Sequence, residues 1–242
     1  MALKSVLLNA PLQRELFVHI LADQDAFHSL DEIFNRTELP TWVTRNPIEI
    51  HTYDVTPDLP LLERKIEDTF KTMDSNFKVE QATDIHTIGC FFRLMAHRII
   101  PPTVEHLLYI DTDVVIMTNL EELWRQVETR PKALFHWGIG MCSGFVVMNV
   151  RRMDEIWTLA KGSPIKIITE EYKQSKNDQL VYMSVNVTYP NEVNVLSEGW
   201  DMTVTNHWQI KHQPYEKKYP NVGMLHFNGG GKSKGPYFSH RR

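Results

Sequence analysis

The sequence has few cysteines, no long apolar run and no large excess of charge of either sign. Only two cysteines, Cys90 and Cys142, occur in 242 residues. They are too few for a disulfide framework and lack the spacing of a zinc site. Each has apolar neighbours, which predicts buried free thiols. No stretch approaches the roughly 18 apolar residues of a membrane helix, so we expect no membrane segment in this chain.

The charge balance also narrows the class of partner. A formal net charge of -4 argues against a nucleic-acid or anionic-membrane binder held by bulk electrostatics. With 42% hydrophobic residues the chain can bury a full core. It has no internal repeat, low-complexity tract or long linker, so we predict a single domain over residues 1–242. The oligomeric state has no signature in the sequence.

Hydrophobic patterning predicts alternating strands and helices in the first part of the chain. Leu16–Ala22 is an apolar run typical of a strand, and apolar residues at helical spacing follow over 26–34. A half-buried strand over 48–53 and a helix over 61–73 come next. This order predicts a largely parallel, layered sheet.

A further helix is predicted over 86–99, with Arg93 in its most apolar part. The Arg93 side chain either extends to water, the commoner outcome, or reaches over the sheet edge toward an anionic ligand. Downstream, Thr118-Asn119-Leu120-Glu121 has the pattern of a capping box at the start of a short helix. Later strands are expected over 133–137, 144–148, 193–196 and 223–226, and helices over 149–161 and beside Asn177.

The stretch from Leu107 to Ile116 runs from apolar residues into Asp111 and Asp113. Such a run predicts a strand buried on both faces. Its two acids would lie at the carboxyl edge of the sheet, where ligands bind in open α/β folds. A hard divalent cation would relieve their mutual repulsion. The alternative is that the acids merely start a loop.

His226 also ends an apolar strand, and the glycine run 229–231 and Lys232 follow it. Glycines let backbone N–H groups close on a phosphate, and Lys232 adds a positive charge. If the two strand ends meet, Asp111, Asp113 and His226 form an oxygen, oxygen, nitrogen set that suits manganese better than magnesium. The alternatives are an edge histidine with other partners and a flexible glycine turn.

Five motifs, in this order, resemble glycosyltransferase family 8. They are Tyr109-Ile110-Asp111-Thr112-Asp113, Asn119-Leu120-Glu121-Glu122-Leu123-Trp124, Ser143-Gly144-Phe145-Val146-Val147-Met148-Asn149-Val150, the pair Asp178-Gln179, and His226-x-x-Gly229-x-x-Lys232. The resemblance runs from about Phe17 to Lys232 and includes Arg93. Within the family, residues 148–153 are most similar to the animal glucoside xylosyltransferases and their LARGE-like relatives.

The resemblance implies an α/β protein with the GT-A fold. Its single domain would have a mixed, mostly parallel central sheet flanked by helices, with a Rossmann-like nucleotide half. The implied activity is a retaining transferase that uses Mn²⁺, with Mg²⁺ as the alternative. It would move xylose, glucose or galactose from a UDP-sugar donor to a glycan or glycoprotein acceptor. Relatives work in the Golgi lumen, which implies a secretory-pathway location.

The resemblance also assigns roles by position. The metal ligands would be Asp111, Asp113 and His226. The residues that contact the nucleotide-sugar would be Arg93, Asp111, Thr112, Ser143, Asp178, Gly229 and Lys232. The catalytic pair would be Asp178 and Gln179. Asp178 would bind sugar hydroxyls, with Gln179 on the acceptor side. Because Gln is a poor nucleophile, we favour front-side departure and attack. A covalent intermediate on Asp178 is the alternative.

Two departures from the family pattern motivate other hypotheses. Residues 1–11 look like the tail of the family's first helix, so its first strand, which carries the uracil-binding residues, is expected to be missing. Cys142 stands where the family has Asn, which removes an amide donor to the sugar. A degenerate member that binds a nucleotide-sugar or a protein without turnover is therefore an alternative. Haloacid-dehalogenase-like phosphatases share the D-x-D pattern, but this chain lacks their second acidic motif.

Overall fold

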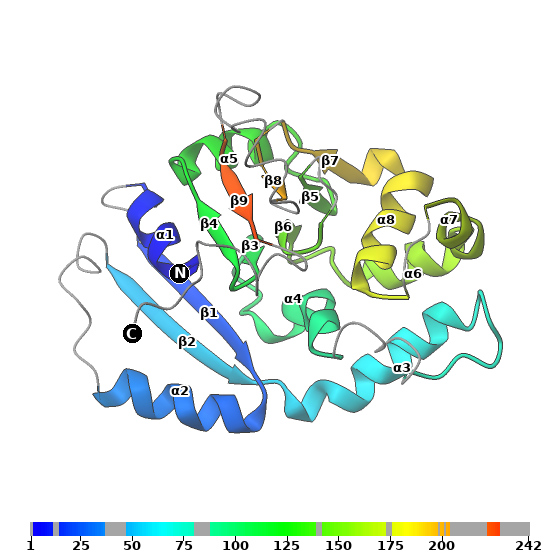
Figure 1. Ribbon diagram of the computed structural model, residues 1–242, viewed down its shortest axis with the longest axis horizontal. Coiled ribbons are helices and arrows are strands. Elements are labelled where there is room, and N and C mark those ends of the chain that lie inside the picture. Colours follow the sequence, from blue (N-terminus) through cyan, green and yellow to red (C-terminus); the bar gives the residue numbers. More distant parts are fainter. Residues whose placement is uncertain are drawn as a thin grey trace.

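The chain folds around strands with helices on their outer faces, as a computed structural model shows (Figure 1). The structure describes residues 2–11, 15–36, 47–79, 88–138, 142–172, 176–197, 199–200, 202–203 and 222–227. Within these residues no helix combines the length and apolar character needed to cross a membrane.

The N-terminal part confirms the predicted alternation of helices and strands. It contains α1 (Ala2–Asn9), β1 (Leu16–Ala22), α2 (Gln24–Arg36), β2 (Ile48–Asp54), the short 3-10 helix η2 (Thr56–Asp58) and α3 (Leu59–Phe70). β1 and β2 pair in parallel, and α2 lies along them. α3 buries Leu62, Ile66 and Phe70 completely, the face that its apolar spacing predicts.

The segment 88–99 is helical, as predicted, and contains two kinds of helix. Ile88–Met95 is a 3-10 helix, η4, and only Ala96–Ile99 is α-helical, as α4. Every side chain from Phe91 to Met95 is buried. The helical segment thus buries its most apolar part, Arg93 included.

The remaining strands form two more hydrogen-bonded sheets. The first has the order β3 (His106–Ile110), β6 (Phe145–Asn149), β5 (Phe135–Trp137), β7 (Val193–Val195), and the second β4 (Val114–Ile116), β9 (Met224–His226), β8 (Met202–Thr203). Three described pairings are parallel and three antiparallel. The expected mixed sheet is present, but parallel pairing does not predominate, because β6 runs antiparallel to both β3 and β5 and β9 runs antiparallel to β4.

The strand before the two acids is less buried than predicted. Leu107 and Tyr109 pack on one apolar cluster and Leu108 and Ile110 on another, so both faces of β3 are covered. All its residues nevertheless keep intermediate exposure. Among the described strands β3 has β6 as its one hydrogen-bonded neighbour, so we attribute the exposure to its other edge rather than to a face.

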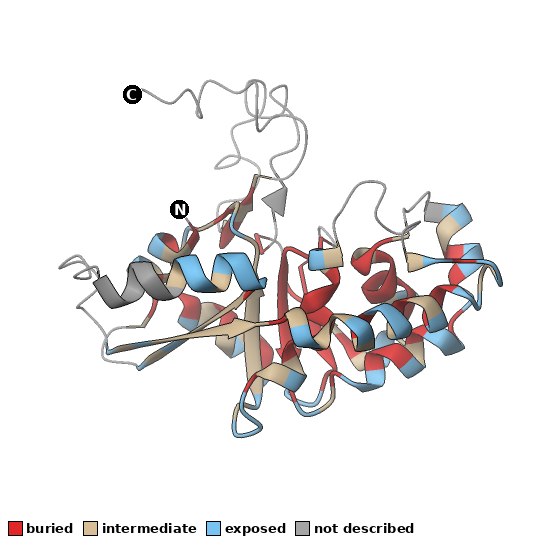
Figure 2. Cartoon of the chain, turned by 90° about the horizontal axis from the view of Figure 1, so that it is seen from below, coloured by how far each residue is buried: buried red, intermediate tan, exposed pale blue. Residues whose placement is uncertain are grey.

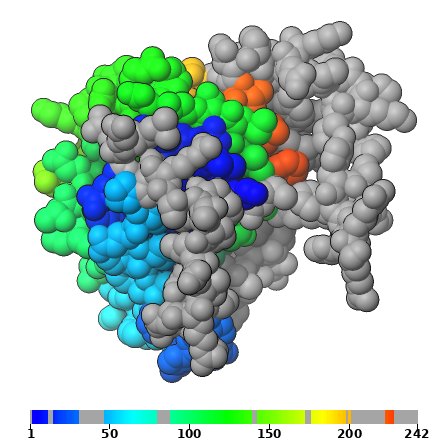
Figure 3. All heavy atoms as spheres, turned by 90° about the vertical axis from the view of Figure 1, so that its left-hand side faces the viewer, coloured from blue at the N-terminus to red at the C-terminus, as the bar shows by residue number. Residues whose placement is uncertain are grey.

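The helices of the second half complete the core. They are α5 (Leu120–Glu128), α6 (Glu155–Gly162), α7 (Ile165–Tyr172), α8 (Asp178–Thr188) and the 3-10 helix η5 (Pro190–Glu192). Figure 2 shows buried residues concentrated where these helices meet the strands, with exposed residues outside. On the opposite side, α1 packs on β4 with β9 beside it (Figure 3).

The start of α5 differs in detail from the predicted capping box. The N-cap residue is Asn119, whose side chain accepts a hydrogen bond from the Glu121 N–H at 2.9 Å. Thr118 lies one residue too early. Both residues are good N-caps, so the pattern alone did not choose between them.

Replacing Asn119 with Ala should lower the free energy of unfolding by about 1 kcal/mol, because one N–H at the start of α5 loses its acceptor. Urea unfolding followed by circular dichroism measures the change. Thr118→Ala is the matched control and should cost less. A larger loss of unfolding free energy in Thr118→Ala would mean that Thr118 is the N-cap, as the capping-box pattern predicts.

His136 on β5 is a fully buried imidazole that contacts the Asn194 side chain through Nδ1 at 3.0 Å. Burial lowers the pKa of His136 to about 4, and the charges of His106 and Arg130 act in the same direction. The neutral ring is thus the native form. The contribution of His136 to stability is complete above the unfolded-state pKa of about 6.5 and declines as the pH falls below it.

We therefore expect the free energy of unfolding to fall more steeply between pH 6.5 and pH 4 in the parent than in a His136→Gln variant, which cannot gain a proton. Urea titrations at several pH values measure both slopes. Equal slopes would show that carboxylates alone cause the acid sensitivity.

Candidate active site

Two strand ends that are far apart in the sequence meet in the structure. β4 and β9 are antiparallel neighbours that place Val114 opposite His226. The Phe227 N–H donates to the Asp113 carbonyl oxygen at 2.9 Å, one step beyond the ladder. The meeting of the strand ends, on which the predicted metal site depended, is therefore present.

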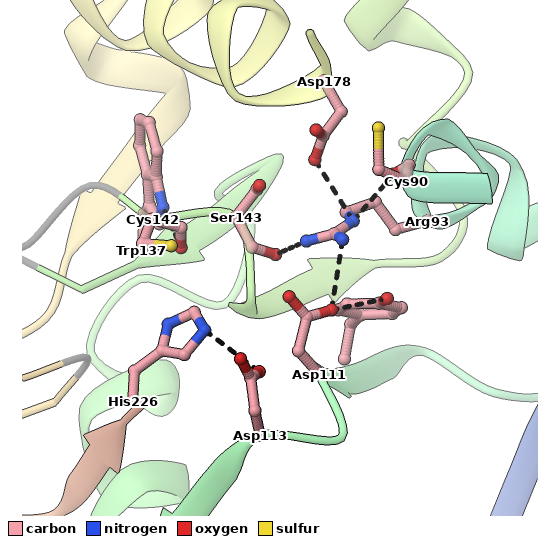
Figure 4. Close-up of polar contacts among 10 residues, drawn as sticks. Cys90, Arg93, Asp111, Asp113, Trp137, Cys142, Ser143, Asp178 and His226 are labelled. Carbon is pink, nitrogen blue, oxygen red and sulfur yellow. Dashed lines mark hydrogen bonds and ion pairs between the residues drawn. The ribbon is translucent and has the colours of Figure 1, made fainter. Parts of the chain in front are cut away.

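Asp111, Asp113 and His226 form a compact cluster of potential metal ligands. Each offers one ligand atom, and these atoms all lie within 4.8 Å of one another. His226 Nε2 lies 3.3 Å from Asp113 Oδ1, and its ring is almost fully buried (Figure 4). Two carboxylate oxygens and one imidazole nitrogen at this spacing fit a divalent cation such as Mn²⁺.

Gly144, at the entrance to β6, leaves the space that this cluster occupies. A Cβ there would lie 2.3 Å from His226 Cε1 and 2.7 Å from Asp111 Oδ2. The Asp111 N–H also donates to the Gly144 carbonyl oxygen at 2.8 Å. The glycine therefore lets the backbone approach the ligands closely while fixing the main chain of one of them.

Arg93 extends from η4 into the site and is buried there (Figure 4). Its Nη2 donates to Asp111 Oδ1 at 3.1 Å, and its Nη1 donates to the Ser143 carbonyl oxygen. Nε lies 3.2 Å from Asp178 Oδ2. Arg93 thus reaches the sheet edge, as the second of its two predicted outcomes required, and its partners are two carboxylates of the chain.

Arg93 and Asp178 form an ion pair without a hydrogen bond between them. The single Nε hydrogen is directed at the Cys90 carbonyl oxygen, 2.8 Å away. Among the described residues, Asp178 Oδ2 has no hydrogen-bond partner despite its ion pair. Burial by itself would lower the pKa of the Arg93 guanidinium, but Asp178, Tyr109 and Asp111 outweigh it and raise the pKa above its usual value. Arg93 is a permanent cation between two acids.

Tyr109 lies beneath the Arg93 guanidinium and also contacts Asp111. The Arg93 Cζ atom is 4.5 Å from the Tyr109 ring centroid, within the range of a cation–π contact. The Tyr109 hydroxyl donates to Asp111 Oδ1 at 2.9 Å. Burial raises the pKa of Tyr109 strongly, and the Asp111 charge adds to the rise although Arg93 opposes it. The phenol therefore remains protonated and a donor.

Three consecutive carbonyl oxygens of the turn before β6 are held by hydrogen bonds. Trp137 Nε1 donates to the Cys142 carbonyl oxygen at 2.9 Å. Arg93 binds that of Ser143, and the Asp111 N–H binds that of Gly144. The turn connects the metal-ligand cluster to Arg93. Cys142 is buried and contributes its carbonyl oxygen to this arrangement.

Asp178 and Gln179 occupy the first turn of α8, which Asn177 caps by accepting from the Leu180 N–H at 3.1 Å. A negative charge is favourable at this end of a helix. Asp178 is buried, whereas Gln179 has intermediate exposure. Burial raises the pKa of the neighbouring Cys90 thiol, and the charge of Asp178 raises it further. Cys90 is thus a neutral partner of Asp178.

The structure brings together six of the predicted site residues, namely Arg93, Asp111, Asp113, Ser143, Asp178 and His226. Thr112 is exposed between the two acids, and Gln179 adjoins Asp178. Gly229 and Lys232 lie outside the described residues. The specific contacts of Tyr109, Gly144, Trp137 and Cys90 were not anticipated. Tyr109 had a signal, since alternate residues of a strand share a face and Tyr109 is two positions before Asp111.

Comparison with known proteins identifies the family. The profile of "Glycosyl transferase family 8" matches residues 5–135, which is more than half of the chain. The chain belongs to glycosyltransferase family 8. No curated protein sequence gives a significant match.

Two solved structures are similar to the chain. Mouse xyloside xylosyltransferase 1 in its apo form is similar with a TM-score of 0.62 at 16% identity, over 94% of this chain and 90% of that one. An active-site mutant of LgtC has a TM-score of 0.46 at 14% identity, covering 90% of this chain and 88% of that one. The likeness to the mouse enzyme confirms the predicted mixed α/β fold of the GT-A type.

Replacing Gly144 with Ala should destabilise the protein by about 1–3 kcal/mol, because the new Cβ forces His226 or the start of β6 to move. Thermal or urea unfolding measures the loss. Gly162→Ala is the control. A Cβ at Gly162 would lie 2.7 Å from the Tyr189 hydroxyl oxygen, which is the end of a side chain and can move away. A Gly144→Ala variant as stable as the parent would show that the cluster is looser than described.

Proposed function

We propose that this family 8 member is a retaining glycosyltransferase that uses a UDP-sugar donor and a divalent cation. It would transfer xylose, glucose or galactose to a glycan or glycoprotein acceptor. The observation that carries the proposal is the Asp111, Asp113 and His226 cluster, joined through Arg93 to Asp178 at the start of α8.

The cluster would hold the cation, and its nitrogen ligand favours Mn²⁺ over Mg²⁺. A cation bound there supplies positive charge that stabilises the diphosphate leaving group. Gly229 and Lys232 follow His226 in the sequence, so we place the diphosphate on that side, with backbone N–H groups and the Lys232 ammonium around it. Thr112 and Ser143 would complete the nucleotide-sugar contacts.

Asp178 and Gln179 would face the sugar at the reacting carbon. The close Arg93 guanidinium stabilises the Asp178 carboxylate and reduces its tendency to attack carbon. Gln179 is a poor nucleophile in any state. Both points support departure of UDP and attack by the acceptor on the same face of the sugar. Asp178 would bind sugar hydroxyls, with Gln179 on the acceptor side.

A second function has one observation in its favour. The Cys142 side chain has no amide donor, and the Cys142 carbonyl oxygen already accepts a hydrogen bond from Trp137. A family member that binds a UDP-sugar without transferring it would tolerate this change. We reject the phosphatase alternative, because the chain belongs to a glycosyltransferase family.

Location follows the family in this proposal. Family 8 relatives that modify glycans and glycoproteins work in the Golgi lumen, so we place this chain in the secretory pathway.

Calorimetric titration of UDP with and without Mn²⁺ tests the proposal, together with hydrolysis of a panel of UDP-xylose, UDP-glucose and UDP-galactose. Binding that needs Mn²⁺, with slow hydrolysis of one donor, supports a transferase and identifies its sugar. Binding without hydrolysis of any donor supports the degenerate alternative. Absence of UDP binding would refute both.

Asp113→Ala should abolish Mn²⁺-dependent UDP binding and leave the fold intact, because the cluster loses one of its two carboxylates. Calorimetry measures binding, and circular dichroism checks the fold. Asp68→Ala removes a carboxylate from exposed α3, where Asp68 contacts Lys161 at 3.4 Å, and should bind as the parent does. Unchanged UDP binding by Asp113→Ala would remove Asp113 from the cation site.

A further inference from the structure

We propose that Tyr109 is a positioning residue for the cation site, which orients Asp111 so that one of its oxygens is held by the protein and the other faces the cation. The inference rests on the proposed cation site and goes beyond it. It assigns a function to a side chain that does not itself belong to the ligand cluster.

The two oxygens of Asp111 have different surroundings. Oδ1 accepts from the Tyr109 hydroxyl at 2.9 Å and from Arg93 Nη2 at 3.1 Å. Oδ2 lies on the side of His226, because a Cβ on Gly144 would be within 2.8 Å of both Oδ2 and His226 Nε2. Oδ1 of Asp111 thus accepts hydrogen bonds from the protein, and Oδ2 faces His226 Nε2.

Arg93 alone is poorly suited to fix this orientation. Its guanidinium is shared among Asp111, Asp178 and the carbonyl oxygens of Cys90 and Ser143. The Asp111 side chain is 29% exposed, so water competes for its oxygens. One charged donor also leaves the carboxylate free to pivot about that contact. A second donor on the same oxygen removes this freedom and keeps Oδ2 toward His226.

Tyr109 is itself rigidly held. It pairs with Val146 across the ladder between β3 and β6, and its ring packs on the larger apolar cluster. Its other neighbour is the buried Arg93 guanidinium. Residues two apart on a strand point to the same side, so the hydroxyl of Tyr109 and the carboxylate of Asp111 meet without distortion of the chain.

The test compares Tyr109→Phe with Tyr182→Phe. Both changes remove one phenolic oxygen from a largely buried ring, but the Tyr182 hydroxyl has no hydrogen-bond partner among the described residues. Three quantities are measured on the full chain. They are the affinity for Mn²⁺ alone by electron paramagnetic resonance, the Mn²⁺ concentration that gives half-maximal UDP binding, and the thermal unfolding temperature.

Tyr109→Phe should bind Mn²⁺ about 10-fold more weakly than the parent, the usual effect of losing a group that orients a metal ligand. The Mn²⁺ concentration for half-maximal UDP binding should rise by a similar factor, and excess Mn²⁺ should restore UDP binding. Tyr182→Phe should bind Mn²⁺ as the parent does. Rescue by the cation separates positioning from a general structural defect, which excess Mn²⁺ would not repair.

Other outcomes would overturn the inference. Equal Mn²⁺ affinity in Tyr109→Phe and the parent would refute the role of Tyr109 while leaving the cation site in place. Equal weakening in both variants would assign the effect to packing. A parent chain that binds no Mn²⁺, alone or with UDP, would refute the cation site and the role of Tyr109 together. Retention of the Tyr109 ring keeps the fold, and the unfolding temperature checks this.

Discussion

The buried Arg93 guanidinium is the interaction on which the site depends. It lies between Asp111 and Asp178 and over the Tyr109 ring, and it binds the carbonyl oxygens of Cys90 and Ser143. Two carboxylates without this cation would repel each other in a poorly solvated place. Removal of one partner from a buried ion pair typically costs about 3–5 kcal/mol. Arg93 therefore lets the chain bring an acid near the proposed cation and another near the proposed sugar.

The backbone around Arg93 is as organised as the side chains. The turn before β6 gives three successive carbonyl oxygens to Trp137, Arg93 and the Asp111 N–H. Gly144 then permits close approach to His226 and Asp111. Since β4 and β9 are neighbours, Asp113 and His226 are held by the same ladder. Backbone hydrogen bonds thus fix Asp111 to Gly144 and Asp113 to Phe227, and such preorganisation favours the binding of a cation and an anionic leaving group.

The sequence predicted much of the fold, and its errors have physical causes. Strands β1, β2, β6 and β9 lie where apolar patterning placed them. The segment 86–99 was predicted as a helix, and its part from Ile88 to Met95 is a 3-10 helix, a distinction that apolar patterning does not make. The N-cap of α5 is Asn119 rather than Thr118, a choice between two adjacent suitable residues. Antiparallel pairing of β6 and β9 was not predicted, because pairing direction depends on partners far along the chain.

By itself the sequence determined which chemistry is available: two acids after an apolar strand, a histidine after another, an arginine in an apolar segment and an acid at a helix start. These follow from residue type and local pattern, which are short-range properties. Only the tertiary structure decided that Arg93 turns inward to two carboxylates, that Tyr109 and Arg93 share Asp111 Oδ1, and that Gly144 leaves room for His226 beside Oδ2. Some of these contacts join residues more than 100 positions apart in the sequence, such as Asp111 and His226. Such contacts are determined by the packing of the whole chain and not by local sequence.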